Sequence, residues 1–284
     1  MTIRDLGYRA YEGERLPPSH NTSVILAHGI RRAWGSWLIK LVVFFGWLPA
    51  LLPMLFVGVR FWLSRQTGQQ VDTVNNAQLV KSLCMWQMWI CASIITCRAG
   101  AAAIAEDLTH KAFQFYFAKP LTVAQYYAGR VGAVAFFVFG MIAVPVVLLV
   151  LVLVGTAPPE LRLESVGLLL PAILHAAVIA AVLSTASVGM SALSKSRALT
   201  MSAWLILLIV PHVIAGLVFL IGKWPWLYLA SLPGLLGTIG DALFKIEADD
   251  TTLKWFHAAP VLIAIVVGAA AVARWRLQRA EVIA

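Results

Sequence analysis

Hydrophobic residues in this chain are grouped in long runs that short polar segments separate. A helix needs roughly 20 apolar residues to cross about 30 Å of hydrocarbon, and six windows with at most one charged residue each are near or above that length. They cover residues 41–63, 79–97, 123–154, 166–193, 198–221 and 255–273. The pattern predicts an all-α polytopic membrane protein with six transmembrane helices.

A seventh apolar window, residues 224–240, is shorter and contains Pro225, Pro233 and several glycines. Proline and glycine interrupt helices, so we expect this segment to lie in the interface or to re-enter before the last span. Trp224, Trp226 and Tyr228 are typical of residues anchored at headgroup depth.

The segment before the first span has apolar residues at helical spacing and two arginines on another face. This pattern predicts a helix lying in the plane of the membrane. The alternative is that the first span begins early, but Arg31 and Arg32 would be costly inside a bilayer. The interface-helix residues are Leu26, Ile30, Arg31, Arg32, Trp34 and Trp37.

Composition agrees with a membrane protein, since 61% of residues are hydrophobic and 12% are charged. The expected organisation is an N-terminal segment (1–38), a six-helix permease-like domain (39–275) and a short tail (276–284). We expect no cleavable signal peptide, because the first forty residues are polar and charged. Cys84, Cys91 and Cys97 all fall within the second window and are interpreted as small buried hydrophobic residues.

The 22 Lys and Arg residues outnumber the 13 Asp and Glu residues. In the six-span arrangement, about 15 basic residues lie on the side of the two termini and seven on the other. The positive-inside tendency then places both termini in the cytoplasm of a cell whose cytoplasmic (inner) membrane holds the chain. This explanation of the basic excess needs membrane lipid and no nucleic-acid partner.

The stretch AIAEDLTHKAFQFYFAKPLTVAQYYAGR, residues 103–130, separates the second and third spans. Apolar positions from Ile104 onward share one helical side, and Pro120 would end that helix. Thr122 followed by Gln125 predicts a capping box at the start of the third span. We expect a short amphipathic helix with solvated polar groups that either docks in another protein's cleft or packs on the membrane surface.

This stretch resembles the loop of the ATP-binding-cassette type-2 permease family. The matching residues are Glu106, Asp107, Lys111, Tyr116, Phe117, Pro120, Leu121, Tyr126, Gly129 and Arg130. The predicted six spans, interface helix and re-entrant segment are similar to that family's layout. The resemblance implies an exporter permease that pairs with a second permease chain and couples to a separate ATPase subunit through a cytoplasmic coupling helix.

The resemblance also implies site residues. The implied ATPase contacts are Glu106, Asp107, His110, Lys111, Phe113, Gln114 and Tyr116. The second and fifth spans would line the substrate path, with Met85, Trp86, Trp89, Met201, Trp204 and His212 as candidates. This chain has no GxxxxGK[ST] phosphate loop, so ATP and Mg²⁺ are expected on the partner ATPase and no cofactor on this chain.

Ionisable residues inside a membrane are candidate functional groups. His175 and His212 are two within the predicted spans, and we expect each to be a neutral side chain bonded to a carbonyl of a neighbouring helix. An uncharged path favours a lipidic, amphiphilic or drug-like substrate over a small ion, which would need polar ligands at the midplane.

Three other function classes are weighed against the permease. An intramembrane enzyme is disfavoured because no HExxH pattern and no serine with a positioned base is recognisable; the external carboxylates, with Glu160, Glu164 and Asp241 among them, are interpreted as solvated. An ion-coupled secondary transporter would usually need an acidic residue at mid-depth in the membrane, and this class is disfavoured because the predicted spans contain none. A non-transporting membrane anchor stays open. No metal site is expected.

Overall fold

The structure is a computed structural model that describes residues 20–68, 75–113, 116, 121–222, 224–246 and 253–283. Its described residues form helices and connections, and six helical segments are long and apolar enough to cross a membrane. These are Trp37–Thr67, Asn76–Thr109, Val123–Thr156, Pro159–Ser191, Arg197–Gly222 and Trp255–Arg279. The predicted fold class and the six spans are confirmed.

Several spans are built from more than one element. The first contains α2 (Trp37–Phe45) and α3 (Leu48–Thr67), and the fourth contains η3 (Pro159–Leu161), α9 (Arg162–Gly167) and α10 (Leu169–Ser191). The second contains α4 (Asn76–Gln87), η1 (Met88–Ala92), α5 (Ser93–Ile95), η2 (Thr96–Gly100) and α6 (Ala103–Thr109). The third, fifth and sixth are α8 (Val123–Thr156), α11 (Arg197–Gly222) and α13 (Trp255–Ile283). Outside the spans lie α1 (His20–Trp34), η4 (Pro225–Ala230) and α12 (Leu232–Leu243).

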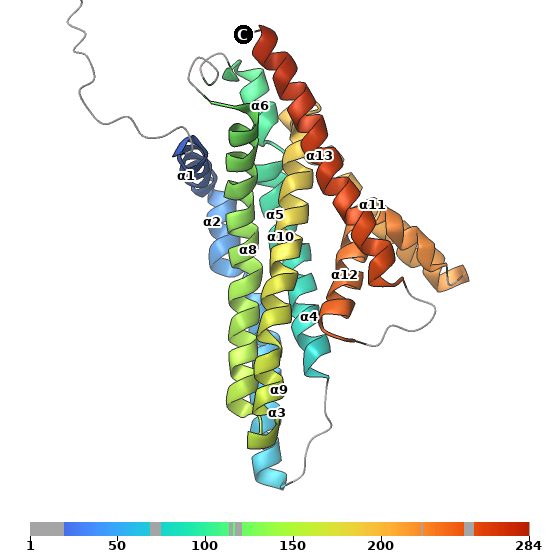
Figure 1. Ribbon diagram of the computed structural model, residues 1–284. Helices are drawn as coiled ribbons and strands as arrows, with labels where there is room; N and C mark the ends of the chain where they lie inside the picture. The colour runs from blue at the N-terminus through green and yellow to red at the C-terminus, as the bar shows by residue number, and fades with distance from the viewer. Residues whose placement is uncertain are drawn as a thin grey trace, which may run out of the picture.

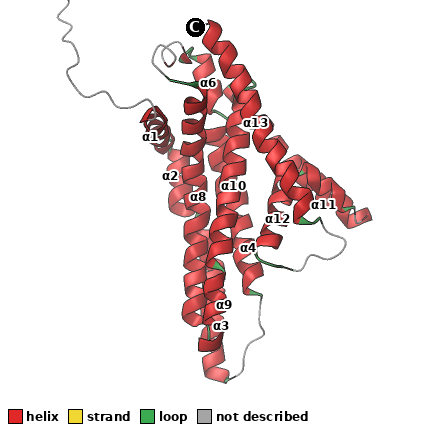
Figure 2. Ribbon diagram, in the orientation of Figure 1, coloured by secondary structure: helices red, strands yellow, loops and turns green. Residues whose placement is uncertain are grey.

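The centre of the bundle is formed by α8 and α10, which run side by side next to the second span (Figure 1). Ile142, Leu149 and Leu183 are fully buried there. Figure 2 shows the helical character of the whole arrangement, with α11 and α12 standing out to one side. The helices α1 and α6 and the C-terminal end of α13 lie at one end of the bundle, which we call the α6 end.

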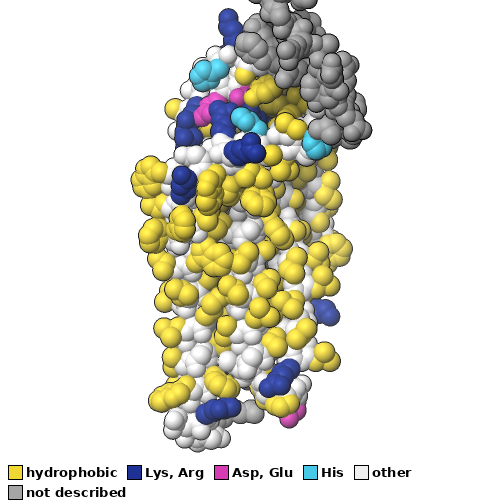
Figure 3. Space-filling model, turned by 90° about the vertical axis from the view of Figure 1, so that its left-hand side faces the viewer, with side chains coloured by type: hydrophobic (Ala, Val, Ile, Leu, Met, Phe, Trp, Pro, Cys, Tyr) yellow, Lys and Arg dark blue, Asp and Glu magenta, His cyan; other side chains and the backbone are white. Residues whose placement is uncertain are grey.

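The outer surface is suited to hydrocarbon. On the face shown in Figure 3, apolar side chains form a continuous band, and charged side chains gather toward its two ends. Most of α11 is exposed and apolar, as at Leu217, Leu220 and Ile221. A lipid environment would cover such a surface without cost.

The helix α1 lies across the direction of the spans, as the in-plane prediction requires (Figure 1). Glycines let it approach α8 closely: a Cβ on Gly129 would lie 2.7 Å from Ile25 Cγ2, and a Cβ on Gly29 would lie 2.6 Å from Ala133 Cβ. Such distances exclude larger side chains without a shift of one helix. One apolar face of α1 is therefore seated on the bundle.

The predicted interface-helix residues divide between two elements. Leu26 and Ile30 are half-buried, Arg31 and Arg32 are exposed, and the Trp34 ring stacks on that of Phe137 at 6.2 Å. Trp37, expected in the interface helix, is instead the first residue of α2, because α1 ends before Gly35 and Ser36.

The second span departs from a regular α-helix at two π-helical segments, η1 and η2. Polar side chains support the wider turns: Gln87 Nε2 donates to the Gly46 carbonyl at 2.9 Å, and Thr96 Oγ1 donates to the Ala92 carbonyl at 2.7 Å. The Thr96 hydroxyl also accepts from Trp204 Nε1 at 3.0 Å. Such π segments are often found at functional sites, and the hydropathy pattern did not predict them.

The segment between the last two spans is short, as predicted. The helix α12 has 12 residues and is too short to cross the membrane. His175 Nε2 donates to the carbonyl of Leu236 at 3.0 Å, which confirms the expected histidine-to-carbonyl bond. For His212 that expectation is wrong: its Nδ1 is hydrogen-bonded to the Ser231 hydroxyl at 2.8 Å, because Ser231 caps α12 beside it.

Candidate functional site

The loop between the second and third spans begins with α6, which is shorter than expected. The sequence predicts one helix running to Pro120, but α6 ends at Thr109 because Lys111 has a left-handed φ of 51°. The Ala112 N–H bonds to the Asp107 carbonyl at 3.0 Å, which is the closing bond of a Schellman turn. The prediction of an unbroken helix is wrong, and Pro120 lies outside the described residues.

The expected solvation of Asp107 is also wrong, since this residue is only 4% exposed. Its Oδ1 accepts from Arg32 Nη1 at 3.1 Å, and its Oδ2 accepts from the Tyr126 hydroxyl at 2.5 Å and from Arg130 Nη2. Arg130 is itself buried. Burial of this carboxylate is possible because two guanidinium groups and a phenol replace its water.

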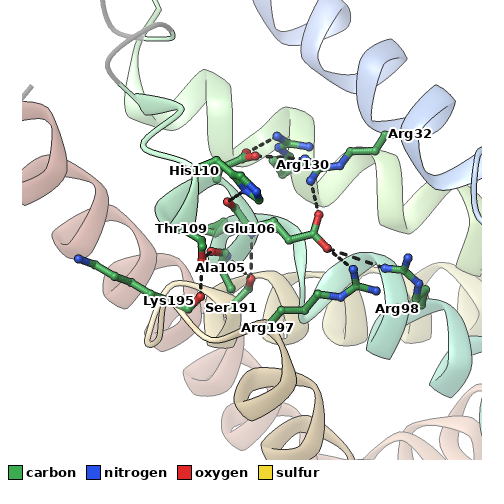
Figure 4. Close-up of polar contacts among 12 residues, drawn as sticks. Arg32, Arg98, Ala105, Glu106, Thr109, His110, Arg130, Ser191, Lys195 and Arg197 are labelled. Atoms are coloured by element: carbon green, nitrogen blue, oxygen red, sulfur yellow. Dashed lines mark hydrogen bonds and ion pairs between the residues drawn. The ribbon is translucent and has the colours of Figure 1, made fainter.

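Glu106 shares Arg32 with Asp107 and also faces two further arginines, Arg98 and Arg197 (Figure 4). Its carboxylate pairs with Arg32, with Arg197 Nη1 at 2.8 Å and with Arg98 Nη1 at 3.9 Å. With Asp107 and Arg130, these residues join α1, η2, α6, α8 and α11 at the α6 end. We call this set the ion-pair network: Arg32, Arg98, Glu106, Asp107, Arg130 and Arg197.

Two aromatic residues of the loop, among those that the structure describes, face inward. The Phe113 ring lies 5.4 Å from the Tyr126 ring and is buried, and the Tyr116 ring lies 5.5 Å from Tyr126. The Tyr116 hydroxyl accepts from Arg130 Nη2 at 3.4 Å. These rings therefore pack beneath the loop and support the buried ion pairs.

Backbone contacts fix α6 to the connection between α10 and α11. The Ser191 hydroxyl accepts from the N–H groups of Ile104 and Ala105, both at 2.9 Å. The Thr109 hydroxyl lies 2.5 Å from the Lys195 carbonyl (Figure 4). The sequence analysis did not identify Ser191 or Thr109, because such contacts join residues more than 80 positions apart.

Among the described residues of the loop, Thr109, His110 and Lys111 are exposed, and we call them its exposed tip. The His110 Nδ1–H donates to the Glu106 carbonyl at 2.7 Å, which holds the ring over the end of α6. Of the implied ATPase contacts, His110 and Lys111 therefore face outward, and Gln114 lies outside the described residues. Contact with an ATPase stays a prediction for all seven.

The candidate path residues lie in several places. Trp89 and His212 meet, with ring centroids 5.0 Å apart. Trp204 is fully buried between the second and fifth spans, and Trp86 is 62% exposed in an apolar groove between α3 and α4. Met201 lines a shallow hollow with Cys97, and Met85 packs near Gly237. A path between two chains stays a prediction.

The carboxylates that the sequence analysis predicts to be external differ among themselves. Glu160 and Glu164 are exposed, whereas Asp241 pairs with Lys81. Glu247, Asp249 and Asp250 lie outside the described residues. Among the residues that the structure describes, no three His, Cys, Asp or Glu side chains gather in a metal-binding arrangement.

In comparisons with known proteins, no protein-family model matches the chain, and no curated protein matches it. Sequence and structure together show a six-span, all-helical, multi-pass membrane protein.

Proposed function

We propose that this chain is the transmembrane permease subunit of an ATP-driven exporter, which pairs with a second permease chain and is driven by a separate ATPase. The proposal rests on the resemblance of residues 106–130 to the type-2 permease loop and on the six-span layout. In this arrangement the α6 end faces the cytoplasm, because the side of the membrane with more Lys and Arg residues tends to be the cytoplasmic one.

The ion-pair network is the observation that carries the proposal. Glu106 and Asp107 connect the loop to arginines on α1, η2, α8 and α11, so a displacement of α6 is resisted at several helices at once. Hydrogen bonds to charged groups contribute about 1.5–3 kcal/mol each. A force on the loop would then move α1 and the spans together, as rigid-body coupling requires.

The exposed tip supplies a surface for the ATPase. Beyond the ion-pair network, His110 presents an imidazole and Lys111 presents a basic amine. An acidic groove on the partner would complement these two groups. ATP and Mg²⁺ would bind to the ATPase, and this chain would contribute the lever and half of the path.

A co-purification experiment tests the proposal. The tagged chain is purified from its native membrane in mild detergent, bound polypeptides with a GxxxxGK[ST] loop are identified by mass spectrometry, and ATP hydrolysis is measured. We expect such a subunit to be retained, and the His110→Glu, Lys111→Glu double variant to lose it.

The control is Lys254→Glu, which changes an exposed lysine at the start of α13, away from the α6 end. This variant should retain the ATPase. Native preparations without any nucleotide-hydrolysing subunit, or equal retention by the loop variant and the control, would contradict the proposal.

A further inference from the structure

A small cavity lies at the α6 end between α1, the second span and α8. Its volume is about 60 Å³. Much of its wall consists of small residues such as Gly29, Ala102 and Ala133, and three guanidinium groups, of Arg32, Arg98 and Arg130, complete it. Since about 10–15 Å³ accommodates one water molecule, the cavity has room for a group of four or five heavy atoms.

Positive charge exceeds negative charge around this cavity. The three arginines face one carboxylate, that of Glu106, in its wall. The whole ion-pair network holds four arginines and two carboxylates, a net charge of +2. Arg130 is the buried member of the three, with its side chain 4% exposed, whereas Arg32 and Arg98 are 38% and 30% exposed. Uncompensated charge is costly where a side chain is withdrawn from water, so an anion in the cavity would compensate the excess positive charge, at Arg130 above all.

Hydrogen-bond donors without an acceptor also support an anion in the cavity. The Arg130 side chain is only 4% exposed, and its Nε–H is buried without a hydrogen-bond partner among the described residues. Among the described residues, Arg98 makes only an ion pair with Glu106, and its N–O distance of 3.9 Å is longer than a hydrogen bond. Buried N–H groups nearly always have an acceptor, so the buried Arg130 Nε–H indicates a missing one. Arg98 is 30% exposed and has donors left for the same acceptor.

We propose that this cavity binds a phosphate group, either the headgroup phosphate of an anionic membrane lipid or free inorganic phosphate. A tetrahedral oxyanion fits the volume and offers acceptors to Arg98 and to Arg130 Nε, and arginine is well suited to phosphate. The cavity is lined by residues of α1, the second span and α8. Charged side chains gather at this end of the apolar band (Figure 3), where lipid headgroups would be found. The inference does not depend on the proposed function.

Three variants of the full chain test this site. Arg98→Gln removes one donor, and Ala102→Leu fills the cavity with three additional carbon atoms while every charge is kept. Arg31→Gln is the matched control, because Arg31 is exposed beside Arg32 and does not line the cavity. Size-exclusion chromatography establishes that each variant is folded.

Two measurements distinguish the sources of phosphate. Native mass spectrometry measures retention of phosphatidylglycerol against zwitterionic phosphatidylcholine, and thermal unfolding in lipid-free detergent measures the response to inorganic phosphate. Preferential retention of phosphatidylglycerol assigns the site to a lipid, whereas stabilisation by millimolar phosphate alone assigns it to the free anion.

In either case, binding should weaken at least about tenfold in Arg98→Gln and in Ala102→Leu, as loss of a charge-assisted contact predicts. The Arg31→Gln variant should bind as the unaltered chain does. Absence of binding in both measurements, or equal weakening in Arg31→Gln, would overturn the proposal.

Discussion

Asp107 illustrates how a single buried carboxylate holds this loop in place. It lies between Arg130 and Arg32 and accepts a hydrogen bond from Tyr126. A buried ion pair is not by itself strongly stabilising, because desolvation offsets much of the attraction. Removal of one partner is different, since the other charge then stays buried without compensation.

The substitution Asp107→Asn keeps the shape of this side chain and removes its charge. We expect it to destabilise the protein by about 3–5 kcal/mol, because Arg130 loses the carboxylate that compensates its buried guanidinium. Thermal unfolding in detergent measures the effect. Glu160→Gln, at an exposed carboxylate in η3, is the control; equal unfolding midpoints for both variants would show that Asp107 is not a structural anchor.

The sequence indicated that Glu106 and Asp107 matter, but not what they contact. Arg32 is 74 positions from Glu106, and no local pattern specifies such a pairing. One signal was available: these two are the only acidic residues between positions 73 and 159. With several arginines expected at the same end, internal ion pairs could have been anticipated, whereas burial of Asp107 could not.

At the scale of elements, the seat of α1 on α8 depends on glycine. Gly129 lies in the first turns of α8, where Ile25 and the Thr22 carbonyl approach it. Gly140, further along the same helix, has no neighbouring atom within 4 Å of a Cβ position. The two glycines differ in packing on one helix, which makes them a matched pair for experiment.

Gly129→Val should displace α1 from α8, at a cost of about 1–3 kcal/mol for the overpacked contact. Trypsin cleavage after Arg31 and Arg32 reports the displacement, because a helix held on the bundle resists proteolysis. We expect cleavage at these sites to become several-fold faster in Gly129→Val and to stay unchanged in Gly140→Val. Similar rates in the two variants would mean that α1 is held by other contacts.

Local signals predicted some elements well. The capping box of Thr122 and Gln125 is present as expected, because both of its hydrogen bonds are formed within three residues. The break at Lys111 was missed, since lysine has no preference for a left-handed φ and the Schellman turn is fixed by surrounding contacts. The sequence did not predict the π segments of the second span, because an apolar sequence has the same hydropathy whether it forms π or α turns.

At the scale of the whole molecule, hydropathy predicted the six spans and the short segment before the last one, because lipid requires long apolar helices. It could not predict how α11 and α12 attach to the bundle, since side chains rather than apolar length decide that. In the structure, α12 is joined to α10 by His175 and to α4 by the ion pair of Lys81 with Asp241.

The ion pair of Lys81 with Asp241 gives the attachment of α12 a direct test. The two side chains are 14% and 31% exposed, so both are partly withdrawn from water. We expect Lys81→Asp or Asp241→Lys alone to place like charges together and to destabilise the protein by about 1.5–3 kcal/mol.

The double variant, with both charges exchanged, should recover much of that loss, because the attraction depends on opposite signs rather than on which helix carries each. Thermal unfolding of the four proteins gives the interaction energy as a double-mutant cycle. Losses that simply add would show that the two charges act independently, and α12 would then be held to the bundle mainly by the apolar contacts around Leu235 and Leu236.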